Sequence, residues 1–326
     1  MNRFVAALAL LLPLSAHAFA LNWPLQCQLG KDCFIQNYVD HDPTDAPLDY
    51  TCHRATYHGH DGNDIRLRSL AAMRAGVPVL AAADGTVIGT RDSMEDISIR
   101  AANAPDITNH ECGNGVHLQH AEGYQTQYCH MQKGSIRVHT GQQVKAGEVL
   151  GLVGLSGDTE FPHLHITVWK DGAKIDPFTS SPIASACDAK RTTDNANELW
   201  ATPIPYQPTA LLNDGFASSN PDREAMRDNP LSPATLPADS PALIYWTDLM
   251  NIREGDMLDV AITGPGDIVL IEKPTKLTQT RALLFSFLGK KNSEGKFAPG
   301  TYRATVTLTR DGETLIRNER TVEIQQ

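Results

Sequence analysis

Apolar and polar residues alternate between residues 160 and 169, in the stretch EFPHLHITVW. A period of two predicts a β-strand with Leu164, Ile166 and Val168 on one face. His163 and His165 would then share the opposite face. Two imidazoles on one face indicate a metal site or a proton-transfer site, whereas a solvated surface strand would carry the same pattern without any chemistry.

Short apolar runs separated by glycine-containing turns fill most of the chain before residue 187. Residues 76–90 predict two strands joined by a hairpin at Asp84-Gly85, and residues 115–131 predict a strand, a turn and a second strand. A helix is expected around residues 63–76. Residues 90–113 are polar and predict a long loop over one edge of the sheet. This part of the chain is therefore expected to be mainly β, with an antiparallel sheet.

The composition changes after residue 187. Residues 188–241 are rich in Pro, Asn, Asp and Ser, which predicts a linker with one short helix around Arg223 to Arg227. Residues 242–326 show short alternating strands with turns such as Asp311-Gly312, and predict a small immunoglobulin-like β-sandwich. This segment offers no catalytic cluster in its sequence. We interpret it as a binding or spacing module, through which an envelope protein partner could bind.

Residues 1–20 have the features of a signal peptide. Arg3 precedes an apolar run from Phe4 to Leu14, and Ala16 and Ala18 frame a small-x-small cleavage pattern. The run is too short to span a bilayer, and no later segment reaches about 18 apolar residues, so the mature chain is expected to lack a transmembrane segment. We expect a periplasmic or secreted protein, with an uncleaved N-terminal anchor as the alternative.

Six cysteines in an exported chain predict three disulfides rather than a zinc cluster, since no Cys-x-x-Cys occurs. Six cysteines allow 15 pairings. The short separation favours Cys27 with Cys33, and a shared hairpin favours Cys112 with Cys129. Cys52 with Cys187 would then remain, and that bond would tie together the two ends of the domain predicted over residues 21–187.

The charge balance limits the possible partners. Lys and Arg number 28 against 38 Asp and Glu, a formal net charge of −10. Surfaces that bind nucleic acid are basic, so this balance argues against nucleic acid as a partner. Binding to any anionic polymer would have to come from a specific cleft.

Side chains with metal-binding chemistry gather in the first part of the chain. The stretch YHGHDGNDIRL places His58, His60, Asp61 and Asp64 within seven residues, and QYCHM supplies His130. A hydrolytic zinc site needs three protein ligands and one open position for water, and His and Asp are suitable ligands. Each of these motifs alone is weak. The absence of His-Glu-x-x-His from the sequence excludes a thermolysin-like helix site.

Five motifs taken together resemble the lysostaphin-type zinc endopeptidases, also called the LytM-domain family, which cut peptide cross-links in bacterial cell walls. In chain order they are HDGND at 60–64, GVPVLA with GTV within 76–87, YCH at 128–130, a glycine-punctuated run at 141–151 and PHLH at 162–165. Asp176-Pro177 follows, as is usual in the family. The resemblance covers roughly residues 55–180, and it implies a lysostaphin-type antiparallel β-sheet peptidase domain.

The resemblance implies that His60, Asp64 and His165 bind one Zn²⁺ per chain. It also implies that His130 and His163 are catalytic histidines, unligated and close to the metal-bound water. The chain would then be a zinc metalloendopeptidase that hydrolyses peptidoglycan cross-links, with peptidoglycan stem peptides as its substrate. Which of the two catalytic histidines takes or gives a proton stays open.

Other polar residues near the motifs have simpler interpretations. His58 lies outside the ligand set of the family, Asp61 is expected to be solvated, and Asp176 is expected to close a turn. The chain departs from the family in the loop SGDTEF before PHLH and in the length of residues 90–113. Both segments are expected to border the cleft, so they bear on substrate preference.

Two further functions fit the same resemblance. Some members of the family have lost metal ligands and act as non-catalytic envelope regulators that activate cell-wall amidases. This chain retains all three implied ligands and both implied catalytic histidines, which favours an enzyme. A secreted protease for glycine-rich peptides would use the same site, and the sequence does not separate it from a peptidoglycan endopeptidase.

Overall fold

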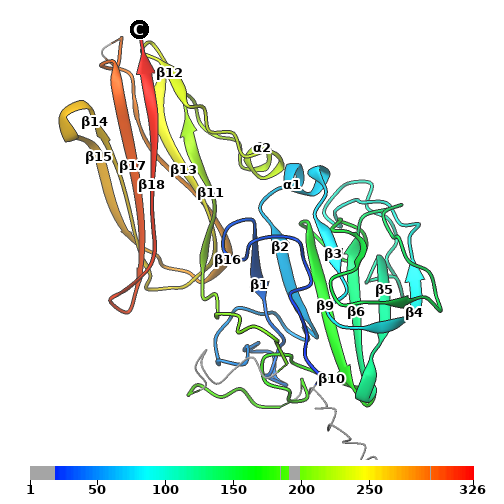
Figure 1. Ribbon diagram of the computed structural model, residues 1–326. Helices are drawn as coiled ribbons and strands as arrows, with labels where there is room; N and C mark the ends of the chain where they lie inside the picture. Colours follow the sequence, from blue (N-terminus) through cyan, green and yellow to red (C-terminus); the bar gives the residue numbers. More distant parts are fainter. Residues whose placement is uncertain (1–18, 184, 191–198, 294) are drawn as a thin grey trace, which may run out of the picture.

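The computed structural model describes residues 19–183, 185–190, 199–293 and 295–326. Residues 1–18 of the predicted signal peptide therefore lie outside the described residues. The chain forms two mainly β-domains (Figure 1), an N-terminal domain over residues 19–209 and a C-terminal domain over residues 210–326. Within the described ranges, neither helix is long and apolar enough to cross a membrane.

The N-terminal domain is built on one antiparallel sheet. Its strands follow the order β1-β2-β9-β6-β5-β4-β7, and β10 also pairs with β9. Leu164, Ile166 and Val168 are at most 1% exposed and lie in the core, which confirms the alternation predicted for this strand. The strands are β1 (Cys33–Asn37), β2 (Asn63–Leu67), β4 (Gly85–Arg91), β5 (Asn114–Gln119), β6 (Tyr124–Met131), β7 (Gln143–Val144), β9 (His163–Lys170) and β10 (Ala173–Ile175).

The hairpin predicted at Asp84-Gly85 is wrong. β3 (Pro78–Leu80) pairs with β8 (Val149–Leu152) in a separate two-stranded sheet, whereas β4 joins the main sheet. Ala81 and Ala82 are fully buried between these strands, and Ala82 N–H donates to Tyr128 Oη at 2.8 Å. The chain passes from one sheet to the other at this point because the core accepts these small side chains. The turn over residues 121–123, between β5 and β6, is as predicted.

The helix expected around residues 63–76 is only half correct. Residues 63–67 form β2, because Ile65 and Leu67 are buried in the sheet. The helix α1 (Leu70–Ala75) begins after Ser69, whose side chain accepts a hydrogen bond from Ala72 N–H at 3.1 Å. This side-chain cap satisfies one of the free N–H groups of the first turn, so the helix starts at the cap.

The three disulfides join Cys27 to Cys33, Cys52 to Cys187 and Cys112 to Cys129. The pairing favoured by short separation and the pairing favoured by a shared hairpin are therefore confirmed, and so is the pairing that remained. The bond between Cys52 and Cys187 spans 135 residues of sequence, so it holds an early loop of the domain against the segment that follows β10.

The C-terminal domain is a two-sheet sandwich. A three-stranded sheet, β11-β13-β16, and a five-stranded sheet, β12-β18-β17-β14-β15, share one apolar core that includes Phe216, Tyr245 and Val306. The sandwich predicted here is confirmed, and its description as immunoglobulin-like stays a prediction. The strands are β11 (Ala210–Ala217), β12 (Thr235–Pro237), β13 (Ala242–Ile252), β14 (Met257–Gly264), β15 (Ile268–Lys276), β16 (Arg281–Lys291), β17 (Gly300–Arg310) and β18 (Glu313–Gln325).

Residues 191–198 of the segment predicted as a linker, 188–241, lie outside the described residues, and much of the described remainder is built into the two domains. Trp200 and Ile204 lie in the core of the N-terminal domain, whereas β11 and β12 are strands of the sandwich. The short helix is present as α2 (Arg223–Asp228). In the described part of this segment, the Pro and Asn residues therefore belong to turns that join buried segments of the two domains.

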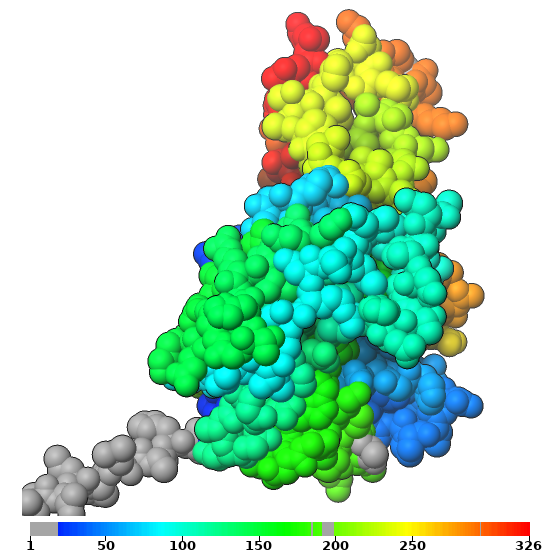
Figure 2. All heavy atoms as spheres, turned by 90° about the vertical axis from the view of Figure 1, so that its right-hand side faces the viewer, coloured from blue at the N-terminus to red at the C-terminus, as the bar shows by residue number. Residues whose placement is uncertain are grey.

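The two domains contact each other along β1, the outermost strand of the main sheet (Figure 1). Phe34 of β1 packs against Leu212 and Met250 of the C-terminal domain. Two amide side chains bond to the outer side of β1: Ile35 N–H donates to Gln207 Oε1 at 2.8 Å, and Asn251 Nδ2 donates to Gln36 O at 2.7 Å. Figure 2 shows the C-terminal domain, yellow to red, lying above the N-terminal domain.

A buried arginine near this contact is expected to stabilise the sandwich. Arg310 bonds to both carboxylate oxygens of Asp256, at 2.8 and 2.9 Å, and its side chain is 9% exposed. Arg310→Ala should lower the free energy of unfolding by about 3 kcal/mol, because Asp256 would be left buried without its charge partner. Denaturant titration measures the change. Arg303→Ala, which removes a half-exposed pair with Glu319, is the control and should cost under about 1 kcal/mol.

Candidate metal centre

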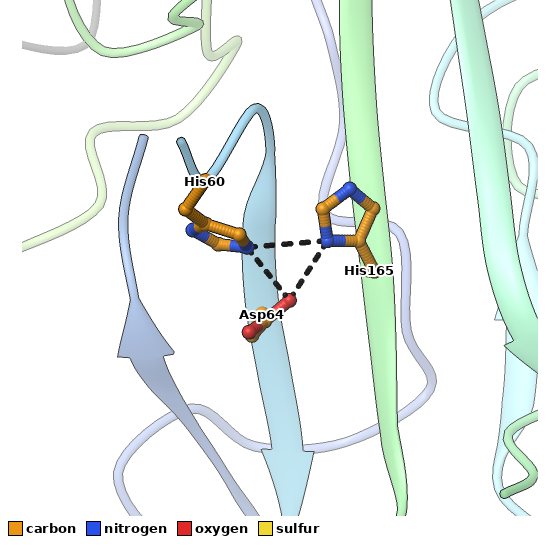
Figure 3. Close-up of side chains that lie close together, drawn as sticks. All are labelled: His60, Asp64 and His165. Carbon is orange, nitrogen blue, oxygen red and sulfur yellow. Dashed lines mark hydrogen bonds and ion pairs between the residues drawn. The ribbon is translucent and has the colours of Figure 1, made fainter. Parts of the chain in front are cut away.

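Three side chains that could hold a metal ion meet at one point of the main sheet (Figure 3). β2 and β9 pair in a register that sets Asp64 directly opposite His165, and His60 lies in the turn before β2. His60 Nε2 lies 3.2 Å from His165 Nδ1. Asp64 Oδ1 lies 3.1 Å from the first of these nitrogens and 2.9 Å from the second.

These distances fit a metal ion. Tetrahedral ligands that are about 2.0–2.1 Å from zinc lie roughly 3.3 Å from one another, and the three atoms here are 2.9–3.2 Å apart. Two imidazole nitrogens and a carboxylate oxygen are also a donor set that zinc prefers. Among the residues described by the structure, this is the one group of three or more His, Cys, Asp or Glu side chains with ligand atoms all within 4.8 Å of one another.

Neighbouring groups orient all three side chains toward the shared point. His60 Nδ1–H donates to the carbonyl oxygen of Tyr38 at 2.7 Å, which leaves Nε2 with its lone pair free. Asn37 Nδ2 donates to Asp64 Oδ2 at 2.8 Å, so that the other oxygen faces the histidines. Partners of this kind fix the tautomer and the ring orientation of metal ligands.

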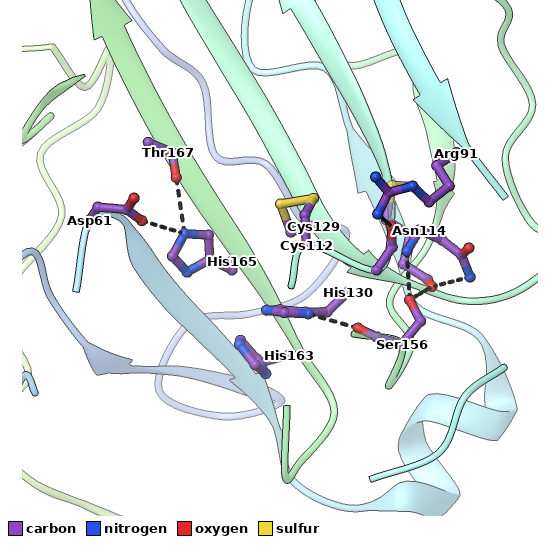
Figure 4. Close-up of a disulfide and its surroundings, with 12 residues drawn as sticks. Asp61, Arg91, Cys112, Asn114, Cys129, His130, Ser156, His163, His165 and Thr167 are labelled. Atoms are coloured by element: carbon purple, nitrogen blue, oxygen red, sulfur yellow. Dashed lines mark hydrogen bonds and ion pairs between the residues drawn. A yellow bond between two sulfur atoms is a disulfide. The ribbon is translucent and has the colours of Figure 1, made fainter. Parts of the chain in front are cut away.

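The third side chain, His165, is oriented from the other side. Its Nε2 lies 2.9 Å from Thr167 Oγ1 and 3.3 Å from Asp61 Oδ1 (Figure 4). A carboxylate can only accept a hydrogen bond, so Nε2 carries a proton, and Nδ1, which faces Asp64, can bind a metal once it gives up its own proton. Asp61 in turn is held by Lys174.

Charge is concentrated at this point. Burial opposes the charged forms of Asp64 and His165, but the contacts between them outweigh it. The pKa of Asp64 is held well below its ordinary value by the rings of His60 and His163 and by hydrogen bonds from His163 and His165. Hydrogen bonds to Asp61 and Asp64 raise the pKa of His165 to about 9. The carboxylate is therefore ionised at neutral pH and can serve as a metal ligand.

Two further histidines lie beside the three ligand candidates without joining them, and Figure 4 shows both next to His165. The rings of His130 and His163 have centroids 4.6 Å apart, and His163 Nε2 lies 3.3 Å from Asp64 Oδ1. His130 Nδ1–H donates to Ser156 O at 2.8 Å. Burial and the neighbouring rings of His163 and His165 hold the pKa of His130 well below its ordinary value, so this imidazole is neutral near pH 7 and can accept a proton.

The candidate site opens into a cleft of about 390 Å³. Its lining includes His60, His130 and His165, and also Tyr57, a residue that is 51% exposed. Glu111 from the loop after β4 and Asp158 from the loop before β9 also line it. Both segments in which the chain departs from the lysostaphin-type pattern therefore border the cleft, as predicted.

The same part of the chain matches a known protein family. Residues 58–177 match the model of peptidase family M23. These residues form an M23 peptidase domain. The M23 domain contains all five residues predicted as metal ligands or catalytic histidines, and the lysostaphin-type resemblance inferred from the motifs is confirmed.

Similar proteins support this assignment of the M23 domain. The chain is 33% identical over 133 residues to the peptidoglycan DD-endopeptidase ShyA of Vibrio cholerae, covering 40% of this chain and 25% of that protein. It is 33% identical over 135 residues to the cell division protein DipM of Caulobacter vibrioides, covering 40% of this chain and 18% of that protein. The chain thus spans a quarter or less of the length of these relatives.

A solved structure is also similar to part of this chain. The catalytic domain of the prophage-encoded M23 protein EnpA from Enterococcus faecalis is 26% identical, with a TM-score of 0.28. The match covers 36% of this chain and 76% of that chain.

The structure shows which of the predicted site residues of the M23 domain lie together and which lie elsewhere. It brings together His60, Asp64 and His165, with His130 and His163 alongside. His58 is exposed and bonds to Thr44 O, away from the cleft.

The interpretation of Asp61 as a solvated residue is wrong, because its carboxylate orients His165 and pairs with Lys174. Asp176 is fully buried and accepts from Phe178 N–H, as expected of a turn, and it also bonds to the ring of His41. Sequence reasoning also missed Asn37 and the Tyr38 carbonyl, since neither lies near a motif.

Proposed function

We propose that this chain is a zinc-dependent endopeptidase that hydrolyses peptide cross-links of bacterial peptidoglycan outside the cytoplasm. The observation that carries the proposal is the convergence of His60, Asp64 and His165 in an open cleft, with two unligated histidines beside them. The similarity to a peptidoglycan DD-endopeptidase supports the substrate class. Three disulfides agree with an oxidising compartment.

The residues of the site would divide the work of amide hydrolysis. Zinc, when bound by the three ligands, supplies a Lewis acid and a bound water of pKa near 7. His130 is neutral and its Nδ1–H is engaged with Ser156 O, so Nε2 can accept a proton. His163 Nδ1 lies 2.9 Å from Phe161 O, and its Nε2 faces the site, 3.3 Å from Asp64 Oδ1. Either ring could take the proton during attack and later return it to the leaving amine.

Retention of the complete residue set supports an enzyme over a non-catalytic regulator. A regulator would need neither Asn37 behind Asp64 nor Asp61 behind His165, and both contacts are made here. A secreted protease for glycine-rich peptides would use the same residues, and only its products would differ.

Digestion of purified peptidoglycan by the mature chain tests the proposal. With zinc, cross-linked dimers should become monomers, and mass spectrometry of the products would identify the bond that is cut. A chelator should stop the reaction, and added zinc should restore it. Intact dimers after incubation with zinc-loaded protein would contradict the proposed substrate, and cleavage of a glycine-rich peptide instead would favour the secreted protease.

Zinc binding should depend on pH. Without metal, the pKa of His165 is about 9, so below that pH the ring holds a proton that zinc must displace. Affinity should therefore rise about tenfold per pH unit up to about pH 9, and fall as the pH is lowered. Calorimetric titration in two buffers of different ionisation enthalpy should show about one proton released per zinc. An affinity that is constant between about pH 6 and 8 would contradict this assignment.

Asn37 should matter for metal affinity although it touches no metal. Asn37→Ala removes the donor to Asp64 Oδ2 and should weaken zinc binding by about 10–100-fold, the usual effect of losing a group that orients a ligand. Competition with a zinc indicator measures the change. Asn22→Ala removes a peripheral bond to Ala82 O and serves as the control. Equal zinc affinity in both variants would show that Asn37 does not orient the ligand.

A further inference from the structure

The disulfide between Cys112 and Cys129 lies in the wall of the cleft that holds the candidate metal centre (Figure 4). Cys129 belongs to β6, directly before His130, and lies opposite His165 in the pairing of β6 with β9. Cys112 lies at the end of the long segment 92–113 between β4 and β5. The bond therefore joins that segment to the strand that carries His130.

His130 has a backbone conformation that is unusual for a strand residue. Its φ is 59°, in the left-handed region, which a residue with a Cβ atom adopts only where its surroundings hold it. Three hydrogen bonds do so here. His130 N–H donates to Cys112 O at 2.8 Å, Gly154 N–H donates to His130 O at 3.0 Å, and the ring donates to Ser156 O at 2.8 Å. The first bond depends on the position of Cys112.

The backbone beside Cys112 also packs against the group that orients the ring of His130. A Cβ atom on Gly113 would lie 2.3 Å from Ser156 O, so the two backbones are in direct contact. Asn114 N–H donates to Ser156 Oγ at 2.9 Å. A shift of Cys112 would therefore disturb Ser156 as well, and two of the three bonds that hold His130 would change together.

We propose that the Cys112–Cys129 disulfide is a positioning element for His130, so that hydrolysis by this chain depends on the oxidised state of the bond. The inference rests on the proposed peptidase function. It concerns one of the three disulfides in particular, since the cysteines of the other two do not line the cleft.

Reduction has a defined outcome. A dithiol reductant supplies two electrons and two protons, leaves as its own cyclic disulfide, and converts Cys112 and Cys129 to thiols. Cys112 can then move with the segment 92–113, and His130 loses its fixed backbone acceptor. The pairing of β2 with β9, which sets Asp64 opposite His165, includes neither cysteine, so zinc binding should persist while catalysis falls.

The test compares two disulfide variants of the full chain on a defined cross-linked peptidoglycan fragment. Cys112→Ser/Cys129→Ser should lower kcat by about 100-fold, the usual effect of misplacing a reacting group by about 1 Å, with little change in KM and one zinc per chain. Cys27→Ser/Cys33→Ser is the matched control and should keep kcat. Unchanged kcat in the first variant, or an equal loss in both, would overturn the inference.

A double-mutant cycle separates positioning from general stability. In a His130→Ala background, removal of Cys112–Cys129 should lower the residual rate no further, because the group that it positions is absent. A full further loss would overturn the inference. Where the double-serine variant does not fold, Cys112→Ala/Cys129→Ala replaces it, with the same loss of kcat as the expected result.

Hydrogen exchange tests the role of the disulfide separately from the proposed peptidase function. The His130 amide, which donates to Cys112 O, should exchange faster after reduction, whereas the amides of β2 paired with β9 should not. An inactive oxidised wild type would refute the peptidase function, and exchange at His130 would still decide whether the disulfide holds this residue. Unchanged exchange after reduction would overturn the inference alone.

Discussion

His60→Ala is expected to abolish stable zinc binding and to lower kcat/KM by about a thousandfold or more. The residue is 2% exposed, and its Nε2 faces both Asp64 and His165. With one of three ligands gone, the chain would lose a metal that contributes several kcal/mol of transition-state stabilisation. Zinc content after dialysis and kcat/KM on a cross-linked fragment are the two measurements.

His58 provides a control two residues away. It is the same residue type, but it is exposed and its ring bonds to Thr44 O. His58→Ala should change zinc content and kcat/KM by less than about twofold, as expected of an exposed side chain outside the site. A His60→Ala variant that kept both its zinc and its activity would show that the ion is held elsewhere. Equal losses in the two variants would point to the folding of this turn.

His130→Ala is expected to separate metal binding from catalysis. The ring is not among the three ligand candidates, so zinc should stay at one per chain. Loss of a neutral group that can accept a proton should lower kcat by about a thousandfold, within the usual range for general acid–base catalysis. Steady-state kinetics and metal analysis on the same sample check both statements.

Variants of His163 test whether the two histidines act in the same proton-transfer steps. If the two rings serve the same proton-transfer steps, His130→Ala/His163→Ala should be little slower than either single variant. Multiplied losses would show that the rings act separately. His110→Ala, in the exposed loop, is the control, and a comparable loss there would mean that the assay responds to the loop and not to proton transfer.

The residues of the candidate site could be predicted from the sequence, whereas most of the groups that orient them could not. His60 and Asp64 share one short motif, His163 and His165 share another, and the resemblance joins them across about 100 residues of chain. The structure adds the register that sets Asp64 opposite His165. Their role as zinc ligands remains a prediction until a metal is measured.

The groups that orient the ligands could not be predicted, because two of them lie outside the motifs and the third depends on a strand pairing. Asn37 precedes Asp64 by 27 residues and reaches it only because β1 and β2 pair. The Tyr38 carbonyl that fixes His60 is a backbone atom, which any residue would supply. Asp61 lies inside the motif, but its spacing does not show that a strand pairing turns it toward His165.

Tertiary burial explains the main errors in the fold. Asp84-Gly85 has the local signal of a hairpin, yet the buried Ala81 and Ala82 carry the chain between two sheets. The segment 188–241 reads as a linker from its Pro and Asn content, yet the chain forms β11 within it and pairs that strand with β13. Local composition therefore predicts turns well, but it does not predict which strands distant in sequence will pair.

The amide contacts along β1 have a consequence for the behaviour of the chain in solution. An outermost strand normally offers free N–H and C=O groups to which a strand of another molecule can add, which is a route to aggregation. Here Gln207 and Asn251 already occupy the groups of Ile35 and Gln36, and the C-terminal domain covers Phe34. The C-terminal domain, together with Gln207 of the N-terminal domain, thus opposes self-association of the sheet that bears the candidate metal centre.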